Sequence, residues 1–137
     1  MTFPIRVRAA TMPLAFAQAA LAIGARAFDP EAIEEREVRE VRAHGPTAEA
    51  LFAHWINECL YVHEVEGFAW RRIDFAVFDA ESRAGAEPMR LHSFLHGESL
   101  EPGGPPPRGT MAAIAAGAVS LRSLGDEFEL SVERPCC

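Results

Sequence analysis

Two periodicities of apolar residues run along this chain, and they predict two helices among several short strands. Apolar side chains recur at helical spacing over residues 12–28 and again over residues 48–65. A threonine, Thr11 or Thr47, stands just before each stretch, as is typical of a helix N-cap. Gly67 follows the second stretch and suits a helix end in the left-handed conformation.

The remaining apolar residues mostly alternate with polar ones, a period of two that predicts β-strands. Strands are expected at residues 5–9, 33–44, 68–79, 89–96 and 127–132. Residues 97–108 are rich in proline and glycine and predict a loop, whereas residues 110–121 are compatible with a strand or a helix. This order predicts an α+β two-layer domain, with two helices packed on one face of a mainly antiparallel sheet. We expect residues 1–137 to form a single domain.

Each predicted helix carries an apolar stripe that should face the core. In the first helix the stripe comprises Leu14, Ala17, Leu21 and Phe28. In the second helix it comprises Phe52, Trp55, Ile56, Cys59 and Leu60. We therefore expect Leu21, Phe52, Trp55 and Cys59 to be buried where the helices meet the sheet.

The chain is acidic, which argues against one class of function. Its 20 aspartates and glutamates outnumber its 13 basic residues, all of them arginine, and the formal net charge is −7. Binding nucleic acid requires a basic surface that neutralises phosphates, so we expect no direct nucleic-acid binding and favour a protein partner. Without lysine, Schiff-base and phosphate-loop lysine chemistry is excluded.

No segment predicts a membrane span or a secretory signal. The apolar stretch at residues 12–23 is too short to cross a bilayer and contains a proline. The three cysteines are Cys59, Cys136 and Cys137, an odd number that forms no disulfide framework. We expect a cytoplasmic protein without a membrane partner.

Two groups on the second predicted helix have side chains that can carry chemistry. Cys59 and His63 share one face, where they can bind a metal together or simply pack in the core. His54, Glu58 and Tyr61 share the other face, where an acid can orient a histidine base. Such a row is also typical of a solvated helix face. We favour core packing and a solvated face, and predict no catalytic residue.

His92 and His96 lie four residues apart and therefore on one side of a predicted strand. Paired histidines can bind zinc or respond to pH. Neither a Cys-x-x-Cys nor a His-Glu-x-x-His motif completes a site, so a partly exposed strand face is the favoured interpretation. The adjacent Cys136 and Cys137 suit either a redox pair or a frayed tail.

The stretch from Thr47 to Phe68, TAEALFAHWINECLYVHEVEGF, resembles the second helix of the archease family. The matching positions are Leu51, Trp55, Asn57, Glu58, Leu60, Tyr61, Glu66 and Gly67. Residues 11–29 resemble the first helix of the family, and Gly97-Glu98 resembles the Gly-Glu that follows its fourth strand. The resemblance covers nearly the whole chain and keeps the order of the elements.

This resemblance implies a non-catalytic protein cofactor that activates an RtcB-type RNA-splicing ligase, as in tRNA splicing, by promoting its guanylylation and turnover. It also implies a calcium site. Where the family has charged positions, this chain has Thr2, Ala113 and Pro135. The metal-ligand candidates that remain are Asp29 and Glu133, so we expect calcium binding to be weak or absent, because calcium prefers six to eight oxygen ligands.

These departures leave two functional hypotheses. The first is an archease-like activator of an RNA ligase. The second is a divergent protein-binding module that keeps the fold but has lost metal binding and ligase activation. A third, a hydrolase built on His54 and Glu58, has no nucleophile at a recognisable position.

Overall fold

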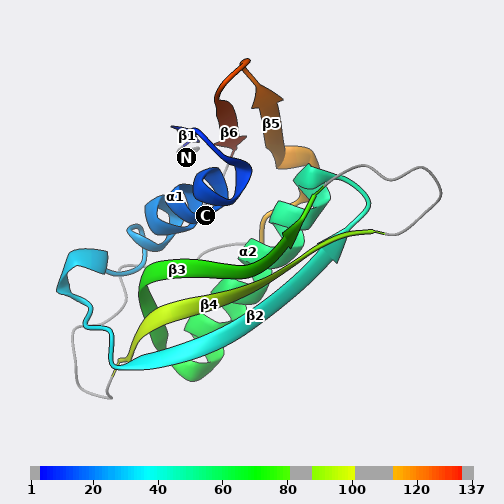
Figure 1. Cartoon of the computed structure of the whole chain (residues 1–137). Helices are drawn as coiled ribbons and strands as arrows, with labels where there is room; N and C mark the ends of the chain where they lie inside the picture. The colour runs from blue at the N-terminus through cyan, green and yellow to red at the C-terminus, as the bar shows by residue number, and fades with distance from the viewer. Residues whose placement is uncertain (1–3, 81–87, 101–112, 134–137) are drawn as a thin grey trace.

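The computed structural model describes residues 4–80, 88–100 and 113–133 (Figure 1). Two α-helices, two short 3₁₀ helices and six strands occupy these residues. In chain order they are β1 (Ile5–Ala9), α1 (Met12–Gly24), η1 (Pro30–Ala32), β2 (Glu37–Gly45), α2 (Ala48–Glu66), β3 (Phe68–Asp79), β4 (Met89–Ser99), η2 (Ala116–Ala118), β5 (Val119–Ser123) and β6 (Phe128–Val132).

The strands form two antiparallel sheets of three strands each. The larger has the order β2-β4-β3, and the smaller, called the small sheet below, has the order β1-β6-β5. The helices pack against these sheets, α2 mainly on β2 and α1 on β1, β3 and β6. This confirms the predicted α+β class, with the difference that the strands divide into two sheets. Strand β1 pairs with β6 alone, so the two ends of the described chain close a sheet of their own (Figure 1).

Local sequence signals account for where both helices start and where α2 ends. The Thr11 hydroxyl accepts a hydrogen bond from the backbone N–H of Leu14 at 3.2 Å, and the Thr47 hydroxyl accepts one from Ala50 at 3.1 Å. Each bond satisfies a backbone donor that has no partner inside the helix. Gly67 ends α2 with a φ of 69°, a conformation that glycine adopts without steric cost.

The buried face of α1 differs from the prediction. The helix ends at Gly24 rather than at residue 28, Leu14 is 47% exposed, and Leu21 is only partly buried. The residues that face the core are mostly small: Ala15, Phe16, Ala19, Ala20, Ile23 and Gly24. Small residues let β3 approach closely, since the Trp70 indole N–H donates to the Ala20 carbonyl at 3.1 Å.

Trp55 lies at the centre of the core, as predicted. It is fully buried together with Phe52 and Cys59. Its indole N–H donates to the Ser93 hydroxyl at 2.8 Å, and that hydroxyl donates to the Val41 carbonyl at 2.9 Å. A buried indole N–H needs a polar partner, and this chain of bonds supplies one while linking α2 to β4 and β2.

The start of β2 and the end of β4 follow from contacts that no local pattern reveals. Strand β3 matches its predicted bounds, whereas β2 begins at Glu37, after a segment in which the Glu34 N–H donates to the Glu98 carboxylate at 2.7 Å. Strand β4 runs on to Ser99, past the predicted end at residue 96. Gly97 permits this, because a Cβ there would run into the backbone carbonyl of Ala69.

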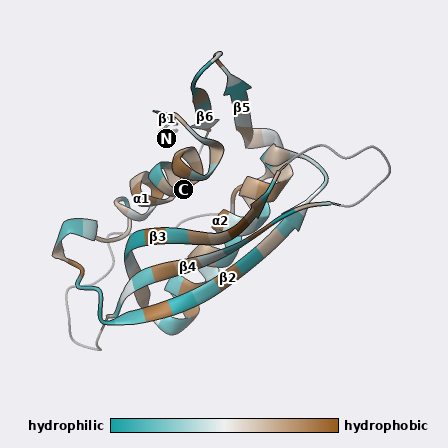
Figure 2. Cartoon of the chain, in the orientation of Figure 1, coloured by the Kyte–Doolittle hydropathy of each residue, from teal (hydrophilic) through white to brown (hydrophobic). Residues whose placement is uncertain are grey.

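Polar and apolar residues alternate along β2 and β4, as expected for strands with one solvated face (Figure 2). Residues 110–121, which were compatible with a strand or a helix, contain η2 and the start of β5 in their described part. Residues 101–108 of the predicted loop lie outside the described residues. No helix among the residues described is long and apolar enough to cross a membrane.

Replacing Trp55 with alanine should lower the free energy of unfolding by about 3–5 kcal/mol, because it opens a cavity and leaves Ser93 without its donor. Urea denaturation followed by circular dichroism measures this loss. Leu14→Ala is the control, since that side chain is 47% exposed and should change stability by about 0.5 kcal/mol or less. Equal losses in the two variants would contradict the assigned core.

Candidate functional site

The two predicted metal-ligand residues lie on different elements. The Asp29 carboxylate caps η1, where it accepts a hydrogen bond from the Glu31 N–H at 3.1 Å, and the residue is exposed. Glu133 directly follows β6, and its backbone N–H donates to the Ala118 carbonyl at 2.9 Å. The structure does not bring them together, because η1 extends beyond the end of α1 while Glu133 lies at the small sheet (Figure 1).

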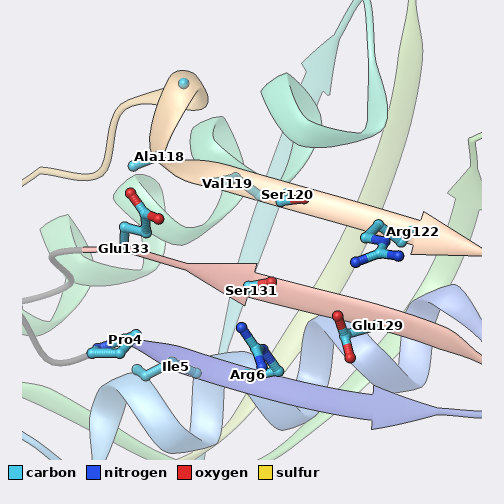
Figure 3. A pocket seen from close by; sticks show the side chains of 11 residues that line it. Pro4, Ile5, Arg6, Ala118, Val119, Ser120, Arg122, Glu129, Ser131 and Glu133 are labelled. Atoms are coloured by element: carbon cyan, nitrogen blue, oxygen red, sulfur yellow. The ribbon is translucent and has the colours of Figure 1, made fainter.

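Glu133 lines a cavity of about 520 Å³ on the face of the small sheet that points away from the core (Figure 3). Alternation along the strands accounts for this face. On β6, Leu130 and Val132 are buried in the core, so the intervening Ser131 points outward. The polar side chains that line the cavity are Arg6, Ser120, Arg122, Glu129, Ser131 and Glu133.

Strand register places all of these side chains except that of Glu133 in two rows across the sheet. Arg6, Ser131 and Ser120 occupy neighbouring positions on β1, β6 and β5. Arg8, Glu129 and Arg122 form the next row.

The carboxylate of Glu129 is nearly buried, and the Arg8 side chain pairs with it at 3.0 Å. A buried charge requires such a partner. The Glu129 carboxylate is therefore already engaged within the sheet.

These residues do not fit a calcium site. Of the two carboxylates that line the cavity, that of Glu129 is held by Arg8, and the guanidinium groups of Arg6 and Arg122 line the same space. Calcium takes six to eight oxygen ligands and is repelled by nearby cations. Over the described residues no group of three or more His, Cys, Asp or Glu side chains is placed to hold a metal ion. Thr2 and Pro135 lie outside those residues.

The outer face of α2 is a solvated helix face. Glu58 and Tyr61 are exposed, and the His54 ring lies 3.7 Å from the Glu58 carboxylate. Nδ1 of His54 lies 3.1 Å from the backbone nitrogen of His44 and 3.0 Å from its oxygen, so either tautomer has a partner. This histidine therefore ties α2 to β2.

Cys59 and His63 belong to the core, as favoured by the sequence. Cys59 is fully buried, and burial raises the pKa of its thiol well above the usual range, so it stays protonated. Nδ1 of His63 lies 3.0 Å from the Phe68 carbonyl, and its ring contacts those of Phe28 and Trp70. Both residues act in packing rather than as metal ligands.

His92 and His96 occupy the outer face of β4, where each faces its own acid. Nε2 of His92 lies 2.8 Å from the Glu40 carboxylate, and Nε2 of His96 lies 2.9 Å from that of Asp74. Neither contact has the geometry of a hydrogen bond, since Nε2 of each histidine is without a hydrogen-bond partner among the described residues. Arg72 also bonds Asp74 and, with His96, lowers the pKa of that carboxyl.

Sequence reasoning missed a clamp between α2 and the segment that leads into η2. The Asn57 side-chain amide donates to the Ile114 carbonyl at 2.8 Å, and its oxygen accepts from the Ile114 N–H at 2.8 Å. Asparagine is a poor residue for a helix interior, and that local conflict is the signal that could have revealed it. The alternation of arginine with apolar residues along β1 was the corresponding signal for the outward face of the small sheet.

Asn57→Ala should lower the free energy of unfolding by about 1–3 kcal/mol, because it removes both partners of the Ile114 backbone. Amide hydrogen exchange should accelerate at Ile114 more than in the large sheet. The neighbouring Glu58→Ala is the control, because that side chain is half exposed. Unchanged exchange at Ile114 in the Asn57 variant would show that the clamp carries no stability.

Calorimetric titration should detect no calcium binding tighter than about 100 µM, because affinity in oxygen sites follows the number and charge of the ligands. Glu133→Gln and Asp29→Asn should leave the titration unchanged. A dissociation constant in the low micromolar range, lost in either variant, would show that these carboxylates do form a calcium site.

Comparisons with known proteins agree on one family. Residues 3–132 match the model of the Archease protein family (MTH1598/TM1083). The chain is 30% identical to a protein archease of Pyrococcus abyssi over 112 residues, 82% of this chain and 75% of that protein. It is 32% identical to a protein archease of Pyrobaculum calidifontis over 91 residues, 66% of this chain but only 58% of that protein.

Solved structures show the same fold at low sequence identity. The solution structure of Methanobacterium thermoautotrophicum protein 1598 covers 98% of this chain and 91% of its own, with a TM-score of 0.73 and 18% identity. An archease from Thermotoga maritima covers 96% of this chain and 89% of its own, with a TM-score of 0.50 and 12% identity. The overall fold is therefore shared with these two structures.

Proposed function

This chain belongs to the archease family, and from that premise we propose that it acts as a protein cofactor of an RtcB-type RNA-splicing ligase. In this proposal it promotes guanylylation of the ligase and so allows multiple turnover in tRNA splicing, without catalysing a reaction itself. The observation that carries the proposal is the family match over residues 3–132.

The charge of the chain supports a protein partner rather than RNA. Its formal net charge is −7, and ion pairs with nearby acids engage several of its arginines, including Arg39, Arg42 and Arg72. A net negative charge disfavours binding along a nucleic-acid backbone and suits a basic patch on another protein. The ligase, rather than its RNA substrate, is therefore the proposed point of contact.

A second candidate function is a protein-binding module that no longer activates a ligase. One observation favours it: the side chains around Glu133 do not fit the calcium site that the family resemblance implies. In this alternative the archease fold is kept by packing around Trp55 and Asn57. Binding of the ligase without activation would distinguish this alternative from the first proposal.

Adding this protein to an RtcB-type ligase with limiting enzyme should raise the yield of joined RNA above one product per ligase molecule. A radiolabelled ligation assay measures the yield, and a parallel assay follows GMP attachment to the ligase. Trp55→Ala is the control, since loss of the fold should remove the effect. An unchanged yield together with binding of the ligase in sedimentation would favour the binding module.

A further inference from the structure

We propose that the cavity on the outer face of the small sheet is an oxyanion site, in which Arg6 and Arg122 bind a phosphate group. This site is distinct from the proposed action on the ligase. The same cavity includes Glu133, which the family resemblance made a candidate ligand of calcium. The arginines in the cavity instead favour an anion.

The geometry brings two arginines to one space from opposite edges of the sheet. Arg6 stands on β1 and Arg122 on β5, and both side chains turn toward the central strand β6 (Figure 3). Ser131 on β6 and Ser120 on β5 complete the row that begins with Arg6. Two guanidinium groups and two hydroxyls therefore surround the same volume.

Charge pairing leaves these two arginines available. The Arg8 side chain neutralises the nearly buried Glu129. By contrast, no ion pair or hydrogen bond joins the side chain of Arg6 or Arg122 to any residue in the described part of the chain. Both residues are exposed, so their guanidinium groups keep free N–H donors that an anion in the cavity would accept from.

The donor set fits a phosphate group. Guanidinium groups donate forked pairs of hydrogen bonds to phosphate oxygens, and hydroxyls donate to a third oxygen. The volume of about 520 Å³ falls within the usual range for small-molecule sites, so the cavity has room for a substituent on the phosphate. The ligand class is therefore a phosphate monoester, with inorganic phosphate as its smallest member.

Glu133 is the one carboxylate at the cavity without an arginine partner among the described residues. It lies beside Ala118, at the end of the cavity away from Arg122 (Figure 3). Its charge opposes an anion there, so it should weaken binding without preventing it. This predicts that Glu133→Gln strengthens phosphate binding, the opposite of what a cation site requires.

The test is a titration of the full chain at low ionic strength, followed by amide chemical shifts, with inorganic phosphate and with phenyl phosphate as the monoester. We expect saturable shifts on β1, β5 and β6 with both probes. Arg6→Ala and Arg122→Ala should each weaken binding about tenfold, the usual effect of losing a charge-assisted hydrogen bond. Tighter binding of phenyl phosphate than of phosphate would identify a monoester as the preferred ligand.

The control is Arg36→Ala, which removes the same charge outside the cavity from an arginine paired with Glu34. It should leave both affinities within about twofold, because that guanidinium group does not line the cavity and donates no hydrogen bond to the anion. The proposal would be overturned if Arg36→Ala weakened phosphate binding as much as the cavity variants do, or if the chemical shifts never saturated. It would also be overturned if the protein bound calcium more tightly than phosphate. Because the isolated protein is used, the result does not depend on the ligase assay.

Discussion

Burial of one tryptophan in the middle of α2 is the constraint on which the rest of the structure depends. Trp55 must be fully enclosed and must also find an acceptor for its indole N–H. The Ser93 hydroxyl accepts that hydrogen bond and donates one to the Val41 carbonyl, so one chain of hydrogen bonds joins α2, β4 and β2. The large sheet is held to the helix by this chain and by the apolar packing around it.

The small sheet depends on the same helix in a different way. Asn57, two residues after Trp55, holds the backbone of Ile114 with two hydrogen bonds, and this segment leads into η2 and β5. Helix α1 packs on the small sheet and also accepts a bond from Trp70 of β3 at Ala20. The two sheets are therefore coupled through both helices.

The outward faces of the two sheets differ in how their charged side chains are paired. On the large sheet, Arg72 pairs with Asp74, and the acids Asp74 and Glu40 also lie against histidines. On the small sheet, Arg6 and Arg122 line a cavity, and Glu129 forms an ion pair with Arg8 in its own row. An acidic protein thus presents two arginines in one cavity, a local excess of positive side chains that its net charge alone does not reveal.

The sequence by itself determined the elements and several of their ends, because caps and periodicity act within a few residues: Thr11, Thr47 and Gly67 lie where the helices begin or end. The resemblance to the archease family then predicted how these elements combine into a fold. The sequence did not determine which face of α1 is buried, because packing against β1, β3 and β6 selects that face, with Trp70 of β3 bonded to the Ala20 carbonyl. Nor did it determine the division into two sheets or the cavity, because β1 and β5 meet through β6, which comes last in the described chain. Contacts between such distant segments exist only once the chain has folded.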